Sequence, residues 1–123
     1  MFTHLHLHTE YSLLDATTRI PELIAKLKDS GMNACAITDH GNMYGAYKFY
    51  KAMKEEGLKP ILGCEIYVAP RKMDQKEFGI DNKYFHLILL AKNLKGYKNL
   101  VKIVSTAHMD GFYYRPRIDF ETL

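Results

Sequence analysis

The chain has 123 residues, 47% of them hydrophobic, and a formal net charge of +3 with its histidines neutral. This length and composition are typical of one soluble globular domain, and the mild charge permits a polyanionic partner without requiring one. No segment is apolar over a transmembrane length, and the first residues lack the order of a signal peptide. We therefore expect a cytoplasmic protein with no membrane partner.

The first part of the chain predicts a strand, a helix and a second strand. A strand over 2–9 precedes a helix that Thr18 can cap and Gly31 can end, with Pro21 tolerated in the first turn. The apolar stripe of this helix consists of Ile20, Leu23, Ile24 and Leu27. A short strand of the buried type follows over 33–38.

A second helix and a third strand come next. Asn42 is the predicted cap of this helix, and Gly57 follows its end. Its predicted core face consists of Met43, Ala46, Tyr47, Tyr50 and Met53. The third strand covers 60–68, so the order is strand, helix, strand, helix, strand. This order favours a parallel sheet with right-handed crossovers.

The order of predicted elements changes in the second half of the chain. Residues 69–83 are polar, lack a helical period and predict a loop. With no crossover helix before it, the strand over 84–91 is expected to return antiparallel beside the third strand. Asn93 can cap a last helix, and 111–117 form an aromatic and basic tail without predicted regular structure. The expected inward face of that helix is Leu94, Tyr97, Leu100, Val101 and Val104.

The two cysteines, Cys35 and Cys64, are far apart in the sequence and form no CxxC pair. Cys35 lies in an apolar run, where a buried reduced thiol is expected. Cys64 precedes Glu65, but neighbours in a strand point to opposite faces, which disfavours Cys64 as a metal ligand. No disulfide framework is predicted, as suits a reducing compartment.

Histidines dominate the start of the chain, where His4, His6 and His8 alternate with leucines. An extended strand directs alternate side chains to one face, so the three imidazoles are expected on the same side. Neutral imidazole is the commonest metal ligand in proteins. His4 lies deeper in the predicted strand and is expected to be an accessory residue. His108, near the end of a helix, has no predicted partner.

Further ligand-type side chains stand at the ends of the other predicted strands. Asp39 and His40 end the second strand, Glu65 lies near the end of the third, and His86 opens the fourth. Asp15 lies in the turn after the first strand and can bend back over the cluster. Because working residues of parallel α/β folds gather where strands end, we expect these residues at one rim. A metal site explains their convergence better than coincidence does.

The chemistry of this ligand set indicates an open, catalytic metal site. Imidazoles and carboxylates without thiolates favour Zn²⁺, Mn²⁺ or Fe²⁺ over a closed structural zinc site. The ligands are too many for one ion, and two or three ions sharing Glu65 would suit phosphoester hydrolysis. Neither a glycine-rich phosphate loop nor a Ser-His-Asp arrangement competes with this interpretation.

These motifs resemble those of the polymerase and histidinol phosphatase (PHP) family of metal-dependent phosphoesterases. The motifs are HLH at 6–8, TDHG at 38–41 and GCE at 63–65. Longer segments are similar to the branch of the family that stands at the amino terminus of bacterial replicative DNA polymerases. They read HLHLHTEYSLLDA, AITDHGNMYGAYKFY, KPILGCEIYV, HLILLAKNLKGYKNLVKIVS and GFYYRPRID. The resemblance runs from Phe2 to Asp119.

The resemblance implies an α/β fold that is a partial, distorted (β/α) barrel, the amino-terminal portion of a seven-stranded barrel. Residues 1–123 would be the amino-terminal portion of a PHP domain, a fragment of a larger polymerase chain with further ligands downstream. The implied metal ligands are His6, His8, Asp15, His40, Glu65 and His86. Among them, His8, His40 and Glu65 are expected to carry catalysis with two or three divalent ions. His4 stands where many members of the family have Asp.

The function implied by the resemblance is metal-dependent 3′ to 5′ exonuclease activity during DNA replication. The implied partners are DNA, the remainder of the polymerase chain and other replisome subunits. One alternative is a structural module in which metal braces the polymerase without catalysis. Another is a small-molecule phosphomonoesterase of the histidinol phosphatase type. For the tail at 113–117, packing against the rest of the polymerase is favoured over contact with DNA phosphates.

Overall fold

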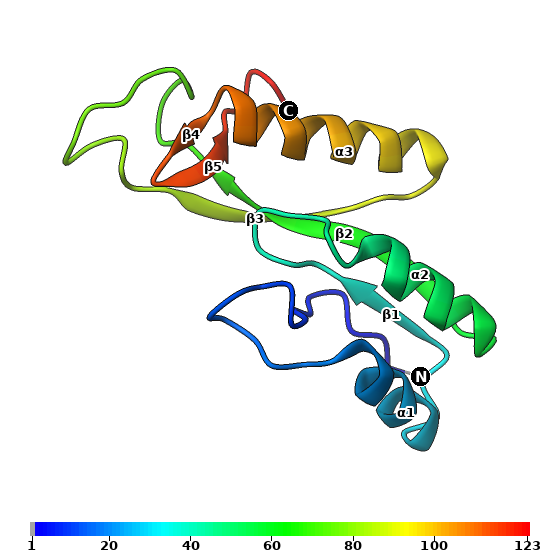
Figure 1. The fold of residues 1–123 in the computed structure, drawn as a ribbon. Coiled ribbons are helices and arrows are strands. Elements are labelled where there is room, and N and C mark those ends of the chain that lie inside the picture. The colour runs from blue at the N-terminus through cyan, green and yellow to red at the C-terminus, as the bar shows by residue number, and fades with distance from the viewer. Residues whose placement is uncertain (1) are drawn as a thin grey trace.

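The strand β2 (Lys59–Val68) is central to the sheet in this computed structural model, which describes residues 2–123. Its first half pairs in parallel with β1 (Ala34–Ile37), and its second half pairs antiparallel with β3 (Phe85–Leu90) (Figure 1). Its last two residues also pair in parallel with β5 (Arg115–Ile118). The result is a mixed five-stranded sheet in an α/β fold.

Three helices cover this sheet in the described part of the chain, and they build two apolar clusters. Helices α1 (Ile20–Asp29) and α2 (Ala46–Glu55) pack with β1, whereas α3 (Leu94–Met109) packs on the second half of β2 and on β5. In Figure 1, α3 lies on one side of β2 and α1 on the other. No helix within residues 2–123 has the length and apolar character needed to cross a bilayer.

Several predicted elements are confirmed. The stripe of α1 is buried, and Pro21 lies in its first turn. The pairing of β3 with β2 is antiparallel, and Val68 faces Phe85, so the start of β3 lies at the end of β2 as expected. Asn93 caps α3 by accepting a hydrogen bond from the Gly96 amide. Residues 69–83 form neither helix nor strand.

The predicted regular strand over 2–9 is wrong. The segment runs beside β1 but makes only an isolated parallel bridge between His4 and Cys35. The Leu7 amide donates to the side-chain oxygen of Thr38 instead of to a main-chain carbonyl. The side chain of Thr38 therefore replaces a rung of the ladder, and the segment bends instead of extending.

The predicted caps of the first two helices are also wrong. Arg19, not Thr18, is the N-cap of α1, and its side chain makes no capping hydrogen bond. The N-cap of α2 is Gly45. The side-chain oxygen of Asn42 instead accepts a hydrogen bond from the Tyr44 amide, so it stabilises the turn that precedes the helix.

The predicted core faces of α2 and α3 are rotated from the observed ones. In α2, Phe49 is buried, whereas Tyr47 and Tyr50 are exposed. Phe49 has no hydroxyl group to satisfy, which makes it the better core residue than either tyrosine. In α3, Leu94 and Val101 are exposed. The residues that α3 packs inward are Leu100, Ile103, Val104 and Ala107.

The tail predicted without regular structure forms a hairpin of β4 (Phe112–Tyr113) and β5. Arg117 on β5 is fully buried, and its guanidinium donates to main-chain carbonyls. The accepting residues are Met73, Gln75, Asp81 and Gly111. Arg117 therefore ties the loop over 69–83 to the sheet. Because Arg117 is buried, it is available neither for contact with DNA phosphates nor for packing against the rest of a polymerase.

Replacing Arg117 with Met should lower the free energy of unfolding by about 3 kcal/mol, because buried carbonyls lose charge-assisted donors. Urea unfolding, followed by hydrogen exchange of the amides in 69–83, measures the loss. Arg19, which is exposed, gives the matched control, and Arg19→Met should change stability by less than about 0.5 kcal/mol. Equal stability of the two variants would contradict a clamping role for Arg117.

Candidate metal centre

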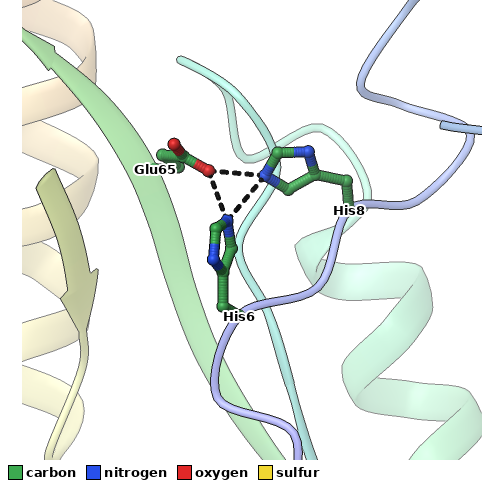
Figure 2. A group of neighbouring side chains, drawn as sticks. All are labelled: His6, His8 and Glu65. Atoms are coloured by element: carbon green, nitrogen blue, oxygen red, sulfur yellow. Dashed lines mark hydrogen bonds and ion pairs between the residues drawn. The ribbon is translucent and has the colours of Figure 1, made fainter. Parts of the chain in front are cut away.

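The carboxylate of Glu65 on β2 is the meeting point of four imidazoles, although its residue is only 6% exposed. Its Oε2 lies 2.6 Å from Nε2 of both His6 and His8. Its Oε1 lies 3.1 Å from Nε2 of His40 and 2.8 Å from Nδ1 of His86. Figure 2 shows His6, His8 and Glu65, with one ring nitrogen of each imidazole directed at the same carboxylate oxygen.

Backbone pairing brings these side chains together. His40 follows β1 and forms a parallel bridge with Glu65, in which the Gly41 amide donates to the Glu65 carbonyl. His86 pairs with Tyr67, two residues beyond Glu65 on the same strand. The bent segment that carries His6 and His8 is held to β1 by the Thr38 amide, which donates to the Leu7 carbonyl. Four separate stretches of chain thus converge.

The donor atoms form two groups that could each hold an ion. One consists of His6, His8 and Glu65, and the other of His40, Glu65 and His86. The Nε2 atoms of His6 and His8 lie 3.2 Å apart, close to the spacing of about 3.3 Å between ligands of tetrahedral zinc. Glu65 offers one oxygen to each group, so it could bridge two ions.

His40 supplies a further sign that this cluster suits a metal ion. Its Nε2 is buried and has no hydrogen-bond partner of acceptable geometry among the described residues. It lies 3.1 Å from Glu65 Oε1, but the two atoms are not aligned for a hydrogen bond. An unpaired buried nitrogen is costly, and a bound cation would use its lone pair. The residues present therefore fit a divalent metal ion.

The electrostatics of Glu65 agree with the role of an anionic ligand. Burial raises its pKa, but the hydrogen bonds with His8 and His6 and the nearby imidazole of His40 outweigh burial and lower the pKa to about 2. The group is thus a carboxylate at neutral pH. A carboxylate in this state can ligate a metal without first losing a proton.

Asp15 reaches the cluster through His40 instead of through Glu65. Its Oδ2 lies 2.8 Å from Nδ1 of His40, and this hydrogen bond is the main cause of the lowered pKa of Asp15. The contact fixes the tautomer in which Nδ1 carries the proton and Nε2 presents its lone pair. Direct ligation by Asp15 stays a prediction.

Asp39 organises the backbone around the site. From the sequence, only its place at the rim was expected. It is buried and accepts hydrogen bonds from the Thr9 amide, the Thr9 hydroxyl and the Ser12 hydroxyl. The Ser12 hydroxyl in turn accepts from the His40 amide. Asp39 therefore fixes the loop between His8 and Asp15. The hydroxyl residues soon after the HLH motif are the sequence signal for this role.

The structure places two other histidines outside the two donor groups. His4 pairs with β1 at Cys35, and its ring packs edge-on against Phe2. His108, for which no partner was predicted, has Nε2 2.7 Å from the carbonyl oxygen of Gly41. It thus holds the turn after His40. This contact joins residues far apart in sequence, so no local pattern could have indicated it.

The cysteines behave as predicted. Both are buried and free. Burial raises the pKa of Cys35 to about 11 and that of Cys64 to about 12. The Cys64 thiol donates to the carbonyls of Asp39 and Asn42. Neither sulfur is a thiolate at neutral pH, and only thiolates ligate metals well.

Gly41 allows the tight approach that brings His40 to the cluster. It has a φ of +62°, and an added Cβ would lie 2.9 Å from Tyr67 Cε2 and 3.0 Å from Pro116 Cγ. We expect Gly41→Ala to cost about 2 kcal/mol of stability and to displace His40. Urea unfolding and metal content by elemental analysis measure both effects. The control is Gly57→Ala, where φ is +70° but no neighbour lies within 4 Å. A metal content equally low in both variants would contradict the role given to the close contacts.

Comparison with known proteins gives the family. Residues 4–123 match the PHP domain family. DNA polymerase III subunit alpha of Aquifex aeolicus (strain VF5) is 52% identical over 128 residues, and that of Borreliella burgdorferi is 51% identical over 123 residues. Each match covers 99% of this chain but only 11% of the relative. The chain therefore spans about a tenth of the length of these relatives.

Solved structures share the fold at low sequence identity. A protein of Bifidobacterium adolescentis described as a metal-dependent phosphoesterase aligns with a TM-score of 0.55 and 20% identity, over 86% of this chain and 34% of that one. An amidohydrolase from Chromobacterium violaceum with bound sulfate and no metal aligns with the same score and identity, over 85% and 34%. The mixed α/β arrangement is thus common to all three, and with its family match this chain belongs to the PHP domain family.

Proposed function

We propose that this chain is part of the PHP domain of a bacterial replicative DNA polymerase and hydrolyses phosphodiesters as a metal-dependent 3′ to 5′ exonuclease. The observation that carries the proposal is the convergence of four imidazoles on the buried Glu65 carboxylate, with Nε2 of His40 unpaired. The resemblance to DNA polymerase III alpha subunits supplies the substrate class.

The proposal includes the place of this segment in a larger protein. Residues 1–123 would form the amino-terminal portion of the PHP domain of a longer chain, which agrees with a match that covers only 11% of each relative. The sheet of the described residues is open, and its closure into a distorted seven-stranded barrel belongs to the proposal. The proposed partners are DNA, the remainder of the polymerase chain and other replisome subunits.

The proposed cofactors are two or three divalent ions, of Zn, Mn or Fe. His6, His8 and Glu65 would hold one ion, and His40, Glu65 and His86 a second. Asp15 would complete the site beside His40. When bound, such ions supply a water-derived hydroxide near neutral pH and offset the charge on the phosphate and leaving oxygen.

The side chains of this chain prepare the site for that chemistry. The anionic Glu65 supplies negative charge beside the ions that the imidazoles would hold. Asp15 holds the proton of His40 on Nδ1 and so keeps Nε2 available. The His6 and His86 side chains are 53% and 41% exposed, so the cluster is open to substrate on their side. Catalysis is assigned to His8, His40 and Glu65, which lie deeper.

A structural role is the second candidate, and a specific observation favours it. The cluster joins the amino-terminal segment, the end of β1, β2 and β3, so a bound ion would cross-link most of the fold. A metal that only braces the polymerase would use the same ligands. The phosphomonoesterase alternative has only the likeness of fold in its favour.

We expect His8→Ala in the full-length polymerase to lose metal and to lower exonuclease activity at least about a hundredfold, with polymerisation retained. Elemental analysis and release of 3′ nucleotides from labelled single strands measure the two effects. The matched control is His4→Ala, which should keep both properties because His4 belongs to neither donor group. If His8→Ala lowers the melting temperature but leaves exonuclease activity unchanged, the structural role is correct and the catalytic one is wrong.

Metal removal should lower both activity and stability. A ligand that binds only the folded state at a hundred times its Kd stabilises that state by about 2.7 kcal/mol. Chelation of the full-length protein should therefore lower its melting temperature and abolish exonuclease activity. Adding back Zn²⁺, Mn²⁺ or Fe²⁺ singly should restore both with at least one ion. Full activity after complete chelation, verified by elemental analysis, would contradict the proposed function.

A further inference from the structure

We infer that a polar pocket beside the candidate metal centre binds the phosphate and base next to the scissile bond of a single-stranded DNA end. Its lining residues are Asn82, Tyr84, Tyr114 and Arg115, and its volume is about 250 Å³. The inference rests on the proposed function, because it assigns a substrate subsite to the same centre. None of the four residues belongs to the two donor groups.

The pocket and the donor groups share a wall of aromatic rings. The Tyr84 ring lies with its centroid 5.6 Å from that of His86 and 5.0 Å from that of Tyr67. Tyr67 in turn lies 5.3 Å from His86 and 5.6 Å from His40. Only the Tyr84 ring would therefore separate a ligand in the pocket from the His86 imidazole. This separation is comparable to the distance between the phosphate and the base of one nucleotide.

The pairing of β5 with β2 brings Arg115 to the same place. Arg117 pairs in parallel with Tyr67, so Arg115, two residues earlier, lies at the level of Glu65 along the strand direction. Pro116 is next to it and approaches the backbone of Gly41, directly after His40. The start of β5 thus borders the open side of the cluster.

Arg115 makes no ion pair within the described part of the chain. It is exposed, and no carboxylate among residues 2–123 lies within ion-pair distance of it. The other two arginines of this region already have partners, since Arg71 pairs with Asp81 and Arg117 donates to buried carbonyls. A planar guanidinium with free donors is well suited to a phosphate group.

The neighbouring tyrosines offer a surface for a base. Tyr114 is 57% exposed and has a φ of +60°, a left-handed conformation that non-glycine residues rarely adopt. This strained position holds an exposed ring beside Arg115 at the turn of the hairpin, and strain of this kind clusters at ligand sites. Aromatic rings next to cationic groups bind single strands with little sequence preference.

Asn82 adds a polar group that is oriented by the backbone. Its Oδ1 accepts a hydrogen bond of 2.7 Å from the Gly79 amide. The oxygen is thereby fixed, and the NH₂ end can donate to a phosphate or a base carbonyl. The pocket therefore combines a cation, a donor and two rings, which matches a nucleotide unit better than a simple phosphomonoester.

The first test compares the kinetics of full-length variants on a short single-stranded oligonucleotide. Arg115→Gln should raise KM about tenfold with a much smaller change in kcat, because a phosphate contact remote from the reacting atoms is lost. Arg115→Lys should recover part of the loss. The matched control, Arg19→Gln, removes an exposed arginine at the start of α1 and should leave KM unchanged. A KM for Arg115→Gln equal to that of the control would overturn the inference.

The second test does not depend on catalysis. An oligonucleotide with a 3′-terminal 4-thiothymidine is irradiated with the full-length protein, and the adducts are mapped by mass spectrometry. Adducts on Tyr84 or Tyr114 that are lost in Arg115→Gln and kept in Arg19→Gln support the subsite. Adducts elsewhere in the domain, or adducts unaffected by Arg115→Gln, overturn it.

The two tests separate this inference from the proposed function. If His8→Ala abolishes exonuclease activity while Arg115→Gln is normal in both tests, the subsite is wrong and the function stands. If no exonuclease activity exists but the adducts form as described, the subsite stands as a binding site without hydrolysis. Binding of inorganic phosphate that is as sensitive to Arg115→Gln as oligonucleotide binding, without adducts on either tyrosine, would overturn the assignment to DNA.

Discussion

The burial of one negative charge governs this structure. Glu65 lies within the sheet, where an unpaired carboxylate would be strongly unfavourable, and imidazoles from separate stretches of chain surround it. Each of these stretches must hold its register for the contacts to form. The buried carboxylate of Asp39 likewise holds a neighbouring segment in place, since it accepts hydrogen bonds from the loop that follows His8. Fold and site are therefore specified by the same polar contacts.

Local patterns were sufficient for the elements whose hydrophobic residues have one consistent spacing. The stripe of α1 and the apolar β1 follow directly from such patterns, whereas the antiparallel direction of β3 follows from the lack of a crossover helix before it. In α2, aromatic residues occur on several faces, so spacing alone could not distinguish Phe49 from Tyr50 as the core residue. The alternating start of the chain failed as a strand because the side chain of Thr38 takes a ladder position, a competition that no local pattern reveals.

The candidate ligands were predictable because strand ends concentrate functional groups, and the structure brings His6, His8, His40, Glu65 and His86 together. The supporting contacts were not predictable, since they join distant parts of the chain. The buried Arg117 gathers carbonyls from the loop over 69–83, and its sequence context is that of a basic tail. Long-range hydrogen bonds to main-chain carbonyls depend on no particular partner side chain, so the sequence carries no mark of them.

The contact between His108 and the Gly41 carbonyl makes the last turn of α3 a mechanical support for the turn that carries His40. A sliding or tilting of that helix by a fraction of a hydrogen-bond length would pull on the peptide next to the imidazole. Since α3 packs on the sheet through Leu100, Ile103 and Ala107, the core contacts that fix the helix also set the position of this turn.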